Sequence, residues 1–278
     1  TIGGNLLMRR LPKCENYSFC SELSDSELDD SELGDSELGG SKFNDVDLSG
    51  ARISGRMSLT GATLKGELNM DSIFIREDLL MRKATFKKDV MLTNADIGDE
   101  LSMSCSVFEE RLNMSSINVG SSLNMNSDYT RKEIEKRDAN GYERDANRYK
   151  CSRDARFNDV VLKNSTIGQH MRMIGALSSV KKSSDTSVDS IRLDMSSSYI
   201  SGSLKLMSSS FETIALQYIQ IGQNLNLEDA KVYTQTDLTG ASIHKSLKLN
   251  AKKWGENDSE DKKLVLHHTS VNTLLMPD

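Results

Sequence analysis

The sequence is poor in the residues that mark the commonest kinds of protein. Its 278 residues include only 2 prolines, 1 tryptophan and 4 cysteines, and aromatic residues make up 5%. No run of 18 or more apolar residues occurs, so no membrane-spanning helix is predicted. Lys and Arg number 35 against 41 Asp and Glu, so the basic stripe typical of nucleic-acid-binding domains is missing. We therefore expect neither a membrane span nor direct binding to nucleic acid.

Sequence motifs for catalysis, cofactors and metals are also missing. There is no P-loop, no GxGxxG and no Ser/His/Asp arrangement. The sequence therefore predicts no catalytic residues, no cofactor, no metal site and no enzymatic activity. Cys14, Cys20, Cys105 and Cys151 form no CxxC pair and lack zinc-type spacing with histidines. This favours free thiols in a reducing cytosol, with a Cys14–Cys20 disulfide as the alternative.

What the sequence does contain is repetition with an unusual period. Residues 21–55 consist of seven five-residue units: SELSD, SELDD, SELGD, SELGG, SKFND, VDLSG and ARISG. Each unit has a large apolar centre and a small or β-branched residue two positions earlier. A period of five fits neither a helix, which repeats at 3.6, nor a strand, which repeats at 2. Two side chains of equal parity can point inward from a short extended segment, and the Asp, Gly and Ser residues after it supply a turn. Each unit thus predicts one side of a solenoid coil.

From Gly55 to Gly120 the period becomes eleven, beginning with GRMSLTGATLK and GELNMDSIFIR. Apolar residues occupy positions 3, 5, 8 and 10. An eleven is two pentads plus one residue, so two elevens predict a coil of 22 residues. The rival interpretation is an 11-residue helical repeat. It is disfavoured because positions 3 and 5 lie on nearly opposite sides of a helix but on the same side of a strand. The pattern resumes at Asn158 and continues, with predicted loops at 180–190 and 256–261.

In these units the chain resembles the pentapeptide-repeat family, whose word is a small residue, Asp or Asn, Leu or Phe, then two polar residues. The resemblance implies an all-β fold, a right-handed quadrilateral β-helix, formed as a single domain over residues 1–278. Four units carry Glu where the family has Asp or Asn. Position 3 of the elevens is usually large, as in Leu68, Leu79 and Leu101, so we expect a wider coil. Both ends look cut, which predicts a piece of a longer protein.

One segment, residues 128–157, breaks the repeat. It carries nine Lys or Arg, seven Asp or Glu and three tyrosines, and it contains RDAN twice. We expect a partly helical insertion that leaves the solenoid and returns without occupying a place in the coil. It is either a solvated excursion or a partner-binding loop, because Tyr and Arg often anchor interfaces and functional residues concentrate on loops. The candidate partner-binding residues are Tyr129, Arg137, Tyr142, Arg144, Arg148 and Tyr149.

Other possible sites have a plainer explanation. His267 and His268 are adjacent, so in an extended segment they point in opposite directions and do not chelate one ion. Methionines recur at position 5 of the repeat, where we expect core packing rather than a metal site. These are Met70, Met81, Met103, Met114, Met125, Met173 and Met195.

The carboxylates of residues 21–40 raise two further alternatives. Calcium-binding β-helical repeats use a nine-residue word, so the period of five disfavours calcium. A DNA-mimicking surface needs its carboxylates on one side. A 20-residue coil would instead spread Glu22, Glu27, Glu32 and Glu37 over four sides and place Lys42 and Arg52 beneath Glu22 and Glu32.

These observations predict a non-enzymatic module that binds another protein. By resemblance, it is a bacterial pentapeptide-repeat protein or the recognition domain of a secreted effector. The alternative is a DNA-mimicking inhibitor or protector of DNA gyrase, and the second alternative is a β-helix enzyme that acts on polysaccharides. The predicted location is the cytoplasm, or a host cytosol for an effector.

Overall fold

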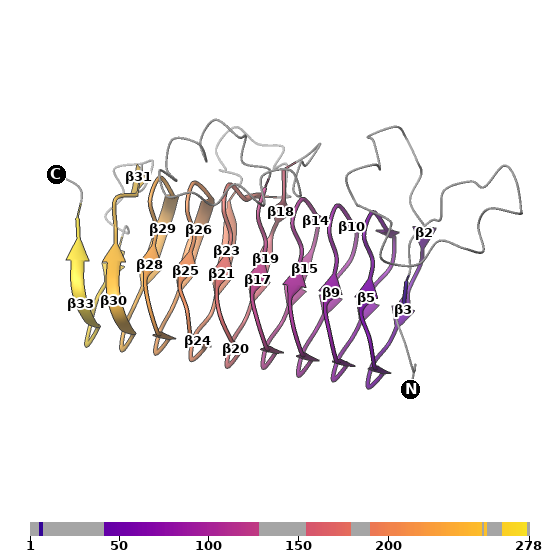
Figure 1. Cartoon of the computed structure of the whole chain (residues 1–278). Coiled ribbons are helices and arrows are strands. Elements are labelled where there is room, and N and C mark those ends of the chain that lie inside the picture. The colour runs from indigo at the N-terminus through magenta and orange to yellow at the C-terminus, as the bar shows by residue number, and fades with distance from the viewer. Residues whose placement is uncertain are drawn as a thin grey trace, which may run out of the picture.

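The chain forms a parallel β-solenoid in which short strands stack into three sheets along one axis (Figure 1). The computed structural model describes residues 6–7, 42–127, 154–178, 190–251, 253–254 and 263–276. No helix occurs in this part of the chain. The predicted all-β solenoid is therefore confirmed, whereas the predicted helical content concerned an insertion that lies mostly outside the described residues.

Each coil passes through four faces, which we number I to IV in chain order. Face I contains β1 (Leu6–Leu7), β5 (Met57–Ser58), β9 (Leu79–Leu80), β13 (Leu101–Ser102), β17 (Leu123–Asn124), β21 (Met171–Arg172), β25 (Leu204–Lys205) and β28 (Leu225–Asn226). Face II is the six-stranded sheet of β2 (Lys42–Phe43), β6 (Thr63–Leu64), β10 (Thr85–Phe86), β14 (Val107–Phe108), β18 (Arg156–Phe157) and β22 (Leu177–Ser178).

Faces III and IV complete the coil. Face III contains β3 (Val46–Asp47), β7 (Leu68–Asn69), β11 (Val90–Met91), β15 (Arg111–Asn113), β19 (Asp159–Val161), β23 (Ile191–Asp194), β26 (Ser210–Ala215), β29 (Lys231–Asp237) and β32 (Lys263–Val265). The first residues of β26 and β29 continue face II beyond β22, and β31 (Lys253–Trp254) pairs with them there. Face IV contains β4 (Arg52–Ile53), β8 (Phe74–Ile75), β12 (Asp96–Ile97), β16 (Asn118–Val119), β20 (Thr166–Ile167), β24 (Tyr199–Ile200), β27 (Gln220–Ile221), β30 (Ser242–Lys248) and β33 (Ser270–Leu275). Faces I and IV share the 17-stranded sheet.

The register of the strands confirms the predicted 22-residue coil. Val90 pairs with Leu112 and Leu101 pairs with Leu123, each 22 residues further along the chain. The predicted neighbours Lys87 and Glu109 form an ion pair between adjacent coils. Near Phe211 one residue is missing, as expected, because Phe211 and Thr213 pair with Val232 and Gln235 and the register shifts between them.

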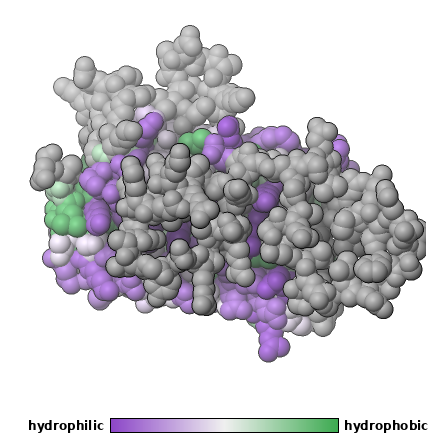
Figure 2. Space-filling model, turned by 45° about the horizontal axis from the view of Figure 1, so that its top comes forward, coloured by the Kyte–Doolittle hydropathy of each residue, from purple (hydrophilic) through white to green (hydrophobic). Residues whose placement is uncertain are grey.

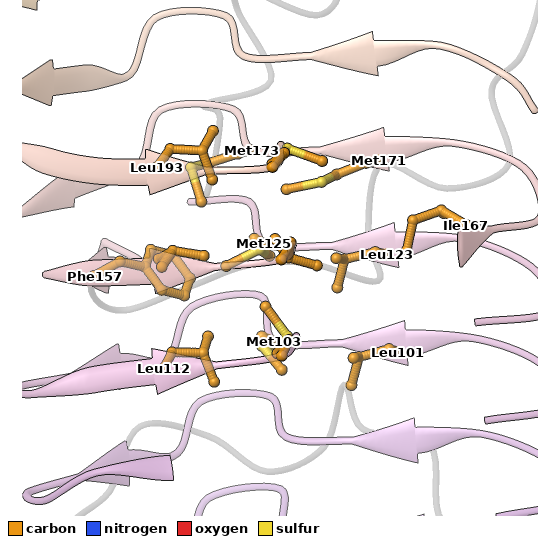
Figure 3. Packing of buried hydrophobic residues seen from close by; sticks show 14 of the residues in the cluster. Leu101, Met103, Leu112, Leu123, Met125, Phe157, Ile167, Met171, Met173 and Leu193 are labelled. Carbon is orange, nitrogen blue, oxygen red and sulfur yellow. The ribbon is translucent and has the colours of Figure 1, made fainter. Parts of the chain in front are cut away.

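The core is a set of apolar columns that run along the solenoid axis. All seven methionines at position 5 have 0% exposure, which confirms that they fill the core. Figure 3 shows one column in which Met103, Met125 and Met173 follow one another from coil to coil. The predicted phenylalanine stack is also present, with ring centroids of Phe86 and Phe108 4.6 Å apart. Stacking of like on like explains why a repeat of period eleven specifies this fold.

The turns between strands share one conformation at position 7 of the eleven. In the described part of the chain, eleven residues other than glycine have positive φ there, most of them serine, asparagine or aspartate, and Gly50, Gly61, Gly175 and Gly240 take the same conformation. A polar side chain at position 4 often supports the turn, as when Ser115 N donates to Oδ1 of Asn113 at 3.2 Å. Such Asx turns favour left-handed conformations after them. The turn therefore depends on local chemistry that repeats every eleven residues.

Replacement by alanine should lower the free energy of unfolding at one of two buried serines in the same turn and not at the other. The Ser106 hydroxyl donates to the Met81 carbonyl and accepts from Ala84 N at 3.0 Å, so Ser106→Ala should lower the free energy of unfolding by about 1 kcal/mol. Ser104 Oγ is buried without a hydrogen-bond partner, so Ser104→Ala should leave stability equal or raise it. Urea denaturation measures both, and an equal loss in the two variants would contradict the assignment.

The described chain breaks off at one side of the solenoid. The longer gaps in the described residues lie between β1 and β2, between β17 and β18, between β22 and β23, and between β31 and β32. Each of these gaps adjoins face II, which is opposite face IV (Figure 1). The predicted loops 180–190 and 256–261 fall almost wholly in these gaps. Face IV therefore has no such gap along its length between β4 and β30.

The predicted insertion ends earlier than the sequence suggested. Ala155 and Phe157 are buried, and Phe157 extends the phenylalanine stack with its centroid 5.3 Å from that of Phe108. The solenoid thus resumes before Asn158, because Ala155 and Phe157 carry the apolar positions 8 and 10 of an interrupted unit. The remaining residues of the predicted insertion, 128–153, lie outside the described residues.

Two further expectations are wrong. A 20-residue coil would place residues 37–38 beside Met57–Ser58, but Leu6 and Leu7 hold that place. The pentads described, from Phe43 to Ile53, do turn their apolar centres into the core, while residues 21–40 are not described. Cys105 was expected as a free thiol but is disulfide-bonded. The other three cysteines lie outside the described residues, and the spacing of cysteines along the chain does not report which of them come close in space.

Candidate interaction surface on face IV

Face IV carries a surface without any Asp, Glu, Lys or Arg. Its outward residues are positions 7, 9 and 11 of every second eleven, because positions 8 and 10 point into the core. Over six successive coils these eighteen positions hold no charged residue of these four types, and none is buried. We call them the neutral patch: Ser116, Asn118, Gly120, Asn164, Thr166, Gly168, Ser197, Tyr199, Ser201, Tyr218, Gln220, Gly222, Gly240, Ser242, His244, His268, Ser270 and Asn272.

The lack of charge on this patch is a departure from the rest of the chain. At the overall share of 27% charged residues, eighteen positions would carry about five. Charged residues do occur on face IV in earlier coils, where the Arg52 guanidinium lies 5.5 Å from the centroid of the Phe74 ring. They stop after Asp96, whose Oδ1 accepts from Asn118 Nδ2 at 2.9 Å. The neutral patch therefore has a defined beginning at the row of Ser116.

Two tyrosines project from the neutral patch. Tyr199 and Tyr218 are 45% and 63% exposed. Tyr218 has φ 58°, a conformation that is unusual for a bulky residue and costs free energy. A Cβ added to Gly240 in the next coil would lie 2.5 Å from Cδ1 of Tyr218, so the tyrosine ring rests directly against this glycine. The fold thus holds an aromatic side chain on the surface at a strained turn.

Three of the six position 11 residues along the other border of the patch are glycines, namely Gly120, Gly168 and Gly222. A Cβ on Gly120 would lie 2.0 Å from the Gly98 carbonyl oxygen, and one on Gly168 would lie 2.1 Å from that of Gly120. Gly222 approaches the Ser201 carbonyl in the same way, at 2.1 Å. The absence of side chains lets adjacent coils approach closely at this corner. It also leaves bare backbone at Gly222, in the same row as Tyr218.

The other faces carry charges that are paired between coils. The Arg56 guanidinium contacts Asp78 at 2.9 Å, and Lys163 Nζ contacts Asp194 at 2.9 Å. Asp159 lies between Arg111 and Arg192, at 3.9 and 3.7 Å. Exposed pairs of this kind contribute about 0 to 1 kcal/mol each. Their effect is to neutralise these carboxylates one by one rather than to gather them into a site.

On face I, polar side chains of adjacent coils are hydrogen-bonded to one another. Asn124 Nδ2 donates to Glu100 at 3.0 Å, and Arg172 Nη1 donates to Asn124 Oδ1 at 3.1 Å. Ser203 N donates to Nδ1 of His170 at 2.9 Å. Asn124 and Ser203 are buried although they point away from the core. Figure 2 looks onto this side and face II, where the visible described residues are mainly hydrophilic apart from an apolar area at the end that holds β33.

The pKa of His170 should make stability depend on pH. Burial, then the charges of Arg172 and Lys205, lower its pKa below the ordinary 6.5. A histidine with a lowered pKa contributes stability that is present above the unfolded pKa and is lost as the pH falls through the folded value. When the pH is lowered from about 6.5 to 5, the melting temperature of His170→Gln should therefore decrease less than that of the wild type. NMR titration should give His170 a midpoint below 6.5, and a higher midpoint would contradict this account.

The sequence-predicted binding residues cannot be placed on this surface. Tyr129, Arg137, Tyr142, Arg144, Arg148 and Tyr149 all lie outside the described residues. His267 and His268 are exposed turn residues, as expected. Among the residues described, no group of three His, Cys, Asp or Glu could hold a metal ion, and no helix could cross a membrane.

The neutral patch itself was missed at the level of sequence. The inward positions of the repeat predict the core, whereas the signal for the patch lies in positions 7, 9 and 11 of alternate elevens. That signal becomes visible only when residues are aligned by coil, which requires the lengths of the intervening excursions. Comparison of the chain with protein-family models, curated proteins and solved structures gives no match.

Proposed function

We propose that the chain is a non-enzymatic binding module that docks another protein on the neutral patch of face IV. The observation that carries the proposal is the patch itself: eighteen adjacent outward positions without Asp, Glu, Lys or Arg. The cores of protein interfaces are depleted in charged residues and enriched in tyrosine. Tyr199 and Tyr218 are the exposed tyrosines of this surface. A rigid solenoid presents such a surface without a large ordering cost.

The proposal keeps the resemblance to pentapeptide-repeat proteins as its framework. Support comes from the paired inward residues of each short strand, as in Ala51 and Ile53, and from four faces per coil. The role of such a module as the recognition domain of a secreted effector, and its location in a host cytosol, rest on the resemblance alone. Fold-level analogy does not identify a partner.

The alternatives receive less support from the described residues. A DNA mimic needs unpaired carboxylates in a regular array, whereas Asp78, Glu109, Asp159 and Asp194 contact cationic side chains. A gyrase supercoiling assay with the purified chain tests the mimic, and inhibition or quinolone protection would favour it. A polysaccharide-acting enzyme needs grouped carboxylates in a groove, and the neutral patch has none.

Capture experiments with two matched variants test the docking surface. Thr166 is exposed in the neutral patch, and Thr234 is equally exposed but lies outside it, in β29. The wild type, Thr166→Glu and Thr234→Glu are each immobilised as the whole chain. The proteins that each of them captures are identified by mass spectrometry and compared. A protein retained by wild type and Thr234→Glu but lost with Thr166→Glu supports the proposal. A partner retained equally by all three overturns the assignment of the surface.

A further inference from the structure

We infer that the neutral patch also binds a second copy of this chain, so that two solenoids associate face to face through face IV. The inference rests on the proposed function, because it names one occupant of the same surface. A symmetric interface brings each surface group near its own counterpart. Any charged patch of one sign would therefore repel itself, and the chain as a whole carries a net charge of −6. The neutral patch is the part of face IV where this repulsion is absent.

The arrangement of large and small side chains on the patch is compatible with a two-fold axis parallel to the solenoid axis. Such an axis places position 7 of one copy opposite position 11 of the other at the same height, with the position 9 columns facing each other. Tyr218 at position 7 is 63% exposed. It would project onto Gly222 of the second copy, which has no side chain to obstruct it. In the same column Gly222 lies between Ser201 and His244, so the projecting tyrosine meets a gap between two larger side chains.

The strained conformation of Tyr218 is consistent with such a role. Among the eleven described non-glycine residues with positive φ, Tyr218 is the one Phe, Tyr or Trp. A smaller residue such as asparagine adopts this conformation at lower cost. Strain that persists at an exposed position points to a use outside the fold of the monomer. Burial of the ring against a second copy is such a use.

The size of the neutral patch indicates how strongly two copies of the chain should associate. Standard interfaces contain about 20 to 30 residues on each side, and the neutral patch has eighteen. The association should therefore be weak and concentration-dependent, with a dissociation constant on the order of 10 to 100 µM. At low micromolar concentration the chain should be a monomer.

Sedimentation velocity of the whole chain from about 2 to 500 µM tests the inference. Wild type should shift from monomer to dimer across this range. With the two-fold axis described, Thr166 faces its own copy, so Thr166→Glu brings two carboxylates together and should weaken dimerisation at least 10-fold. Thr234→Glu, the matched exposed substitution outside the patch, should dimerise like the wild type.

Tyr218→Asn provides a second test that does not depend on introducing charge. It should weaken dimerisation about 10-fold while melting no lower than the wild type, because asparagine tolerates the left-handed turn. A wild type that stays monomeric at 500 µM overturns the inference, and so does equal weakening by Thr166→Glu and Thr234→Glu. If the wild type is monomeric but Thr166→Glu abolishes capture of a different protein, the proposed function stands and self-association fails.

Discussion

Phe108→Ala should lower the free energy of unfolding by about 3 to 5 kcal/mol. Phe108 is 1% exposed and lies in the middle of a stack, between Phe86 at 4.6 Å and Phe157 at 5.3 Å between ring centroids. Removing its ring takes away buried apolar surface and leaves a cavity between the two remaining rings. Neighbouring coils are held in register by backbone hydrogen bonds on all four faces, so they cannot collapse to fill it. Urea denaturation followed by circular dichroism measures the loss.

Val107→Ala is the matched control for this experiment. Val107 precedes Phe108 in β14 and points outward, where it is half-buried. Its truncation should cost about 1 kcal/mol or less. If the two variants lost equal stability, the assignment of inward and outward positions in β14 would be wrong.

Gly120→Ala should lower the free energy of unfolding by about 1 to 3 kcal/mol, although this glycine is exposed. Its added Cβ would lie 2.0 Å from the carbonyl oxygen of Gly98 and 2.9 Å from the carbonyl carbon. Backbone cannot move aside as a flexible side chain can, so two coils would have to separate at this corner. The loss should appear in thermal melting and in urea denaturation alike.

Gly61→Asn is the control for the glycine experiment. A Cβ at Gly61 would meet no atom within 4 Å, and φ there is +71°. Asparagine tolerates this left-handed conformation better than most residues, so the variant should lose only a few tenths of a kcal/mol. Equal destabilisation by Gly61→Asn and Gly120→Ala would show that close packing between coils is not the reason for the glycines at this corner.

The residues that make up the neutral patch on face IV could not be predicted from the sequence, whereas the core residues could. Tyr199 and Tyr218 belong to different units of the repeat, and only the strand pairing places Tyr199 beside Gln220, two residues from Tyr218. The sequence drew attention instead to the tyrosines and arginines of residues 128–157, because that segment departs from the repeat. A local departure is visible along the chain, whereas a surface assembled from one position per coil is not.

By itself the sequence determined the period, the inward residues and the coil of 22 residues. It could do so because a solenoid repeats one local sequence pattern: apolar side chains at fixed positions of a short strand, followed by a polar turn. Only the tertiary structure decided which places the interrupted units fill, as at Phe157, and which outward residues share a face. Those depend on how many residues each excursion adds between two coils, and spacing along the chain does not report that. The neutral patch and the close approach of Gly120 to Gly98 both arise from stacking, because each is a contact or an alignment between residues of different coils.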